Sequence, residues 1–157
     1  MNIKNNFFIN DYIYNKNNKN LCIGIVQSCF NYKISSKYFL YCFKTLKKFN
    51  IKEKNIFYKK VPGVLEIPLI LKKLIKKKKI NSLITLGIII KGETYHFKLI
   101  SNNSWHAITN ISLKYNIPII NSILSVYNKK QAILRIKKNG IYAAKASIQM
   151  ANLCYFF

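Results

Sequence analysis

Acidic residues are scarce in this chain. Only four of its 157 residues are Asp or Glu, against 27 Lys and Arg, so the formal net charge at pH 7 is +23. A charge of that size usually indicates a nucleic acid or an anionic membrane surface as a partner.

Arginine is scarcer still, because Arg135 is the single arginine among the 27 basic residues. Proteins that read nucleic-acid sequence rely heavily on bidentate arginine contacts. The lysines are also spread over the whole chain together with many Ile, Asn, Tyr and Phe residues, a pattern typical of A+T-rich codon usage. We therefore interpret the charge as mainly compositional. Non-specific binding of polyanions is expected, and a specific nucleic-acid partner is not.

Metal-binding and membrane signals are also missing. Cys22, Cys29, Cys42 and Cys154 form no CxxC pair and no zinc-finger spacing. No apolar run reaches 18 residues, and the Asn-rich N-terminus lacks the apolar core of a signal peptide. We expect buried free thiols in a cytoplasmic protein, with no metal, no cofactor and no membrane partner.

Half of the residues are hydrophobic, so the chain has enough apolar side chains for one folded domain. Residues 1–20 are polar and are expected to form an N-terminal arm, whose Phe7-Phe8-Ile9 cluster could add a strand to a neighbouring sheet. Residues 21–157 are expected to form a single domain.

Hydrophobic patterning in that domain predicts alternating strands and helices. Strands are expected at 21–26, 55–59 and 83–90 and from 117 onward, and helices at 34–49, 64–79, 102–115, 129–137 and 140–154. The run at 83–90 is almost continuously apolar, which suits a strand buried on both faces better than an alternating edge strand. The order predicts a three-layer α/β/α fold with a four-stranded parallel sheet flanked by helices.

Polar and aromatic residues follow several of the expected strands. Phe30 follows the first strand, Glu66 the second, and the segment from Lys91 to His96 the third. Ligands of open α/β sheets bind outside the carboxyl ends of the strands. A hydroxyl at Thr94 and an imidazole at His96, which can titrate near neutral pH, would suit a catalytic pocket there.

At this point the sequence resembles the 6,7-dimethyl-8-ribityllumazine synthase family of riboflavin biosynthesis. The resemblance spans residues 21–153, and VPGxxEIP followed by GxTxHF is its most specific combination. The matching segments are GIVQSCFN (24–31), VPGVLEIP (61–68), LGIIIKGETYHF (86–97), IPIINSILSV (117–126), QAILR (131–135) and NGIYAAKASIQMANL (139–153).

The resemblance implies a flavodoxin-like fold and a transferase. Its reaction condenses 5-amino-6-(D-ribitylamino)uracil with 3,4-dihydroxy-2-butanone 4-phosphate to give the lumazine, phosphate and water. His96 would be the proton donor and acceptor. Phosphate would be bound by Glu93, Thr94 and a neighbouring subunit's Arg135. The residues implied in binding the pyrimidine and its ribityl chain are Phe30, Val64, Leu65, Glu66, Ile88, Ile89, Ile90 and Asn121.

The sequence also departs from the family pattern. Asn121 stands where an aromatic residue or histidine is usual, and Ser122 where glycine is usual. The segment at 136–140 is a shortened form of a Gly- and Lys-rich loop. Two rival interpretations remain at this stage: a basic RNA- or membrane-associated domain on the same scaffold, and a shell-forming relative without turnover.

The resemblance further implies a homo-oligomer with active sites shared between subunits. The expected assembly is a pentamer, and twelve such rings could close an icosahedral shell of sixty subunits. The apolar residues of 102–115 and 140–154 support association, because they exceed what one small sheet can cover.

Overall fold

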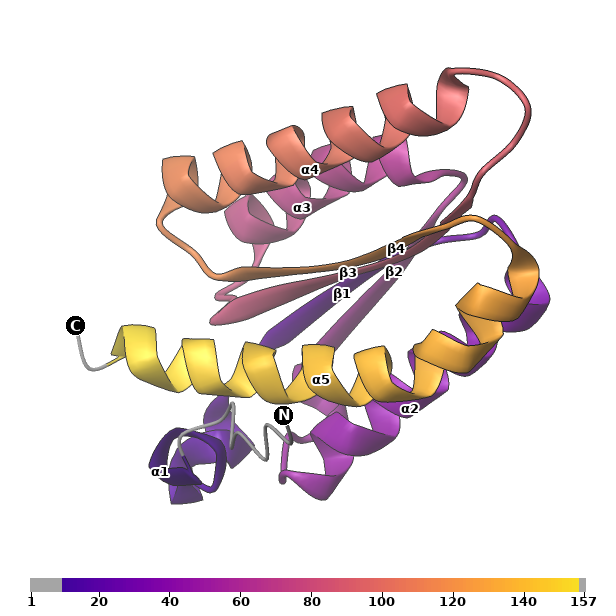
Figure 1. Cartoon of the computed structure of the whole chain (residues 1–157). Coiled ribbons are helices and arrows are strands. Elements are labelled where there is room, and N and C mark those ends of the chain that lie inside the picture. The colour runs from indigo at the N-terminus through magenta and orange to yellow at the C-terminus, as the bar shows by residue number, and fades with distance from the viewer. Residues whose placement is uncertain (1–9, 156–157) are drawn as a thin grey trace, which may run out of the picture.

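The computed structural model describes residues 10–155 and contains a four-stranded parallel sheet in the order β2-β1-β3-β4 (Figure 1). The strands are β1 (Ile23–Ser28), β2 (Ile56–Val61), β3 (Ser82–Ile90) and β4 (Ile119–Val126). The long helices are α2 (Tyr32–Lys48), α3 (Ile67–Lys77), α4 (His96–Tyr115) and α5 (Lys129–Tyr155). Shorter helical segments are α1 (Asn10–Ile13), η1 (Lys16–Asn20), η2 (Glu53–Asn55) and η3 (Val64–Glu66).

Helices cover both faces of the sheet, as the sequence predicted. In Figure 1, α3 and α4 lie on one face and α2 and α5 on the other. Each face has its own cluster of buried apolar side chains, and β3 contributes to both clusters. Residues 82–89 of β3 are all buried, which explains why that strand is mostly apolar; its polar side chains, Ser82 and Thr85, are hydrogen-bonded to carbonyl oxygens of the neighbouring segment. This three-layer arrangement is the flavodoxin-like fold.

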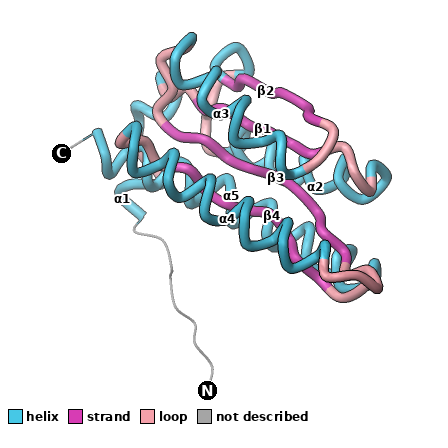
Figure 2. Tube along the Cα trace, turned by 90° about the horizontal axis from the view of Figure 1, so that it is seen from above, coloured by secondary structure: helices cyan, strands magenta, loops and turns pink. Residues whose placement is uncertain are grey.

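The parallel register brings the carboxyl ends of the strands to one edge of the sheet (Figure 2). Ser28 at the end of β1 pairs with Val61, and Ile90 at the end of β3 pairs with Val126. Every helix that follows a strand runs back toward the opposite edge. The loops at the carboxyl edge therefore converge, and this convergence builds the site.

Part of the N-terminal arm packs on the domain. Ile13 of α1 is 2% exposed and belongs to the core cluster that α2 and α5 share. The side-chain amide of buried Asn18 donates to the carbonyl oxygens of Ile13 and Phe49, and Asn152 of α5 donates to Asn18 Oδ1 at 2.9 Å. The Phe7-Phe8-Ile9 cluster, expected to donate a strand, lies outside the described residues.

The prediction of two C-terminal helices was wrong, because Lys129–Tyr155 is one continuous helix. The break expected between them, at residues 138–139, lies inside this helix. Gly140 lies where α5 crosses α2, and a Cβ there would lie 3.0 Å from Tyr41 Cβ and 3.1 Å from the Tyr38 carbonyl oxygen. The glycine thus allows the two helices to approach closely, and the shortened segment at 136–140 is helical rather than a loop.

Two further expectations need correction. Helix α4 begins at His96, six residues earlier than the predicted start at 102, so the GxTxHF segment runs directly into a helix. Of the four free thiols, only Cys42 is buried, whereas Cys29 and Cys154 are exposed. Burial raises the pKa of the Cys42 thiol to about 12. None of the described helices is long and apolar enough to span a membrane.

Candidate active site

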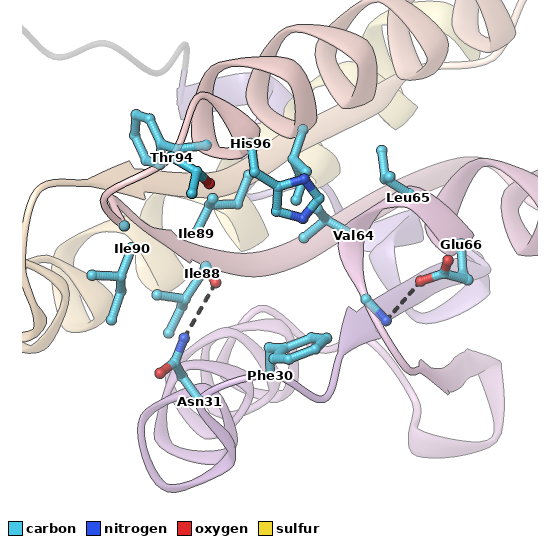
Figure 3. Close-up of a pocket in the computed structure, with 14 residues that line it drawn as sticks. Phe30, Asn31, Val64, Leu65, Glu66, Ile88, Ile89, Ile90, Thr94 and His96 are labelled. Atoms are coloured by element: carbon cyan, nitrogen blue, oxygen red, sulfur yellow. Dashed lines mark hydrogen bonds between the residues drawn. The ribbon is translucent and has the colours of Figure 1, made fainter.

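A cavity of about 400 Å³ lies at the carboxyl edge of the sheet (Figure 3). Four segments form it: the loop after β1, the 63–66 turn, the end of β3, and the loop that leads into α4. Its lining residues are Phe30, Asn31, Gly63, Val64, Leu65, Glu66, Ile88, Ile89, Ile90, Gly92, Thr94, His96, Phe97 and Ile100. Its volume and mostly apolar lining are typical of a small-molecule site.

Phe30 forms one wall of the cavity. Its side chain is 66% exposed, which is unusual for a large apolar ring on a folded domain. The next residue, Asn31, adopts a left-handed backbone conformation at φ 56°, ψ 44° and precedes α2. Asn31 Nδ2 donates to the Ile88 carbonyl oxygen at 3.5 Å, so the loop after β1 is tied to the end of β3 (Figure 3).

Glu66 fixes the turn on the neighbouring side of the cavity. The Gly63 backbone N–H donates to Glu66 Oε2 at 2.8 Å, which closes the turn around η3. A Cβ on Gly63 would lie 2.8 Å from that same carboxylate oxygen and 3.6 Å from the Phe30 ring. Because Gly63 has no side chain, the Glu66 carboxylate can accept the hydrogen bond from the Gly63 N–H while the Phe30 ring lies beside this turn.

The floor of the cavity depends on a second glycine. Gly87 lies within β3, and a Cβ there would come 2.7 Å from Val64 Cγ1 and 3.2 Å from the Ser28 hydroxyl. Val64 is 7% exposed, so it is a buried part of the lining. Because Gly87 has no side chain, the Val64 side chain can pack directly against β3.

We therefore expect Gly87→Ala to destabilise the fold by about 1–3 kcal/mol, the usual cost of overpacking a filled core. Displacement of Val64 should also raise the KM for the ring-bearing substrate. Chemical denaturation and steady-state kinetics would measure the two effects. Gly92→Ala is the matched control for stability alone, because a Cβ at Gly92 meets no atom within 4 Å although Gly92 lines the cavity. Equal stability of both variants would contradict this account of the floor.

His96 enters the cavity from the first turn of α4. Its side chain is exposed at the opening, and it lies across the cavity from Phe30 (Figure 3). Thr94 lies two residues earlier and also lines the cavity. An imidazole and a hydroxyl are thus placed above an apolar floor, where they could exchange protons with a bound ring.

Nine of the twelve predicted site residues line this one cavity, and three do not. Glu93 is exposed in the loop between Gly92 and Thr94. Arg135 is exposed on α5, where Nη1 donates to the Gln131 carbonyl oxygen at 3.2 Å. Asn121 lies in a second cavity of about 370 Å³ beside β4, which Trp105 and Tyr142 also line.

Sequence reasoning did not assign Asn31, Gly63, Gly92, Phe97 and Ile100 to the site. Asn31, Gly63 and Gly92 follow the ends of β1, β2 and β3. Their position just after a strand could therefore have assigned them to the site. Phe97 and Ile100 could have been found only from the earlier start of α4, because one helical turn places both beside His96.

Ser122 lies outside both cavities and is buried in the sheet. The Tyr38 hydroxyl donates to its carbonyl oxygen at 2.9 Å and lies 2.5 Å from its hydroxyl. Burial raises the pKa of Tyr38 well above the usual range for tyrosine, so this hydroxyl stays protonated. Ser122 stands where the family usually has glycine. Its hydroxyl and carbonyl oxygen are hydrogen-bonded to Tyr38 of α2, so the serine fits in the sheet.

A parallel α/β domain with a cavity at the carboxyl edge of its sheet has the architecture of a small-molecule enzyme. The model of the 6,7-dimethyl-8-ribityllumazine synthase family matches residues 20–155. A 6,7-dimethyl-8-ribityllumazine synthase of Neisseria meningitidis is 43% identical over 139 residues, covering 88% of each chain. That of Burkholderia ambifaria is 42% identical over 145 residues, covering 92% of this chain and 85% of the relative. The chain belongs to this family.

Proposed function

We propose that this protein condenses 5-amino-6-(D-ribitylamino)uracil with 3,4-dihydroxy-2-butanone 4-phosphate to give 6,7-dimethyl-8-ribityllumazine, phosphate and water. The observation that carries the proposal is that Phe30, Glu66 and His96, which come from three separate family motifs, line one cavity. Family membership identifies the reaction. The cavity is the place where both substrates would bind and react.

The cavity suits a planar ring with a polar chain. Phe30 offers an exposed aromatic face on which a pyrimidine could stack. Ile88, Ile89 and Ile90 provide the apolar floor at the end of β3. The Glu66 carboxylate and the backbone of Val64 and Leu65 would bind ribityl hydroxyls and ring N–H groups. His96 would then move the protons of imine formation, phosphate elimination and ring closure.

The phosphate end of the site is incomplete within one subunit. No Lys or Arg is among the residues that line the cavity, although a phosphate dianion is bound best by a cationic group. The loop at Glu93 and Thr94 would contribute backbone N–H groups and a hydroxyl. Arg135 of a neighbouring subunit would add the planar guanidinium. Asn121 would reach the site in the same way, because the cavity that it lines is also lined by Tyr142, two helical turns after Arg135 on α5.

Two different exposed apolar surfaces support association between copies. One surrounds the cavity and includes Phe30, Tyr32, Leu65, Leu69, Tyr95 and Leu99. The other follows the β4 side of the sheet and includes Trp105, Leu113, Tyr127, Ile133, Leu134 and Tyr142. Contact between two unlike surfaces is heterologous, and such contacts form a ring when the rotation from one subunit to the next closes. We infer a homopentamer in the cytoplasm, twelve of which could close a sixty-subunit shell.

The function is tested by mixing the purified protein with both substrates and following lumazine fluorescence. A fluorescent product that requires protein is expected, and its absence would refute the proposal. Sedimentation at low and moderate salt tests the assembly. An active monomer would refute the shared site, whereas stable pentamers at every salt concentration would contradict only the shell.

A further inference from the structure

Asn31 precedes α2, but its side chain points toward β3 instead of toward that helix (Figure 3). An asparagine just before a helix usually accepts a hydrogen bond from an N–H of the first turn. Among the described residues of that turn, none donates to the Asn31 side chain. The amide Nδ2 donates instead to the Ile88 carbonyl oxygen at 3.5 Å. The left-handed backbone at Asn31, with φ 56°, is one that asparagine tolerates better than most residues.

The Ile88 carbonyl oxygen lies where the pairing between β1 and β3 has ended. Lys91 donates its backbone N–H to β4. Backbone groups of successive residues in a strand point to opposite sides, so Ile88, three residues earlier, directs its carbonyl to the β1 side. The pairing of β1 with β3 ends at Gln27 and Leu86. The Asn31 amide therefore supplies the donor that β1 would supply if that strand continued.

The position of the Phe30 ring depends on this bond. Phe30 is 66% exposed, so the ring itself has little packing to hold it, and the backbone on either side must place it. Before it, the Cys29 N–H donates to the Val61 carbonyl oxygen at 2.8 Å and ties the turn to β2. After it, Asn31 ties the turn to β3. Because Ile88 also lines the cavity, the Asn31 bond joins the Phe30 wall directly to the floor.

We propose that Asn31 is a positioning residue that sets the width of the slot between the Phe30 ring and the end of β3, and with it the affinity for the pyrimidine ring. The inference rests on the proposed function, in which the ring stacks on Phe30. Asn31 acts through Phe30 and Ile88, because it holds these two surfaces at the spacing that a planar ring requires. A phosphate group bound by the loop at Glu93 and Thr94 lies outside this slot.

The test replaces Asn31 in two ways. Asn31→Gly keeps access to the left-handed backbone region and removes the amide. Asn31→Asp keeps the size of the side chain but at neutral pH presents only acceptors to the Ile88 carbonyl oxygen. Each replacement is made in the wild type and in Phe30→Ala. Asn50→Gly is the matched control, because Asn50 is exposed beyond the other end of α2 and is also left-handed, with φ 66°.

Steady-state kinetics gives the KM for each substrate. Fluorescence anisotropy of added 6,7-dimethyl-8-ribityllumazine measures ring binding without turnover, and chemical denaturation measures stability. With Phe30 present, both Asn31 variants should raise the KM for the pyrimidine and the Kd for the lumazine roughly threefold to tenfold, the range expected for one hydrogen bond. The KM for the phosphate-bearing substrate should change less than about twofold.

In the Phe30→Ala background, the same replacements should change ring binding less than about twofold, because Asn31 then has no ring to position. Effects of equal size in both backgrounds would overturn the proposal, since they would show that Asn31 acts independently of Phe30. Equal effects on the two substrates, or a loss of binding no larger than that of Asn50→Gly, would also overturn it. Wild-type protein that forms no lumazine would instead refute the proposed function, and the anisotropy measurements would still decide the role of Asn31.

Discussion

Replacement of His96 by alanine is expected to slow lumazine formation by roughly tenfold to a thousandfold, at or below the usual contribution of one acid–base group. The imidazole lines the cavity and faces the wall formed by Phe30. Some activity should remain, because the binding surfaces still position the two substrates and the condensation also proceeds slowly without a catalyst. Single-turnover fluorescence, with the protein in excess over the pyrimidine substrate, measures the effect on the chemical steps.

His106→Ala is the matched control for that variant. His106 is exposed on the same helix, ten residues after His96, and lies outside the cavity. The turnover of His106→Ala should stay within about twofold of the wild-type value, as is typical of a substitution at an exposed position away from a site. Wild-type turnover in His96→Ala would remove this imidazole from the mechanism. A similar loss in both variants would instead indicate a general effect on α4.

The sheet and most of the cavity were predictable because the relevant signals are local. The apolar run at 83–90 can be satisfied only by a strand buried on both faces, and β3 is such a strand. The abrupt change to polar residues after Ile90 marks the carboxyl end of that strand. Once the parallel sheet is inferred, all such ends must share one edge, which is why Phe30, Glu66 and His96 could be placed together in advance.

The errors concern features that depend on packing between distant segments. Asn139 and Gly140 resemble a break in a helix, yet the reason for the glycine lies in α2, about a hundred residues earlier, whose backbone leaves no room for a Cβ. The early start of α4 was missed for a similar reason. Phe97 and Ile100 pack against the apolar cluster on the α3 and α4 face, and this packing extends the helix through a polar segment.

Arg135→Lys is expected to raise the apparent KM for the phosphate-bearing substrate by about tenfold, because lysine keeps the charge but loses the bidentate fork. The KM for the pyrimidine should change little. Steady-state kinetics with each substrate varied in turn measures both values. Lys138→Gln, on an exposed position of the same helix, is the control for a change in surface charge on α5. Equal effects of Arg135→Lys on both substrates would contradict a role in phosphate binding.

The shared site can be tested by mixing two variants that are each impaired on their own. Arg135 does not line the cavity of its own chain, so we expect His96→Ala and Arg135→Ala subunits to complement each other in a mixed ring. In a heterologous ring, a site is intact when an Arg135→Ala subunit supplies His96 and its neighbour supplies Arg135. Random mixing in equal amounts should therefore restore about a quarter of the wild-type activity. The two variants are unfolded and refolded together, and each is also refolded alone as a control. No gain over the separately refolded proteins would show that both residues act within one subunit.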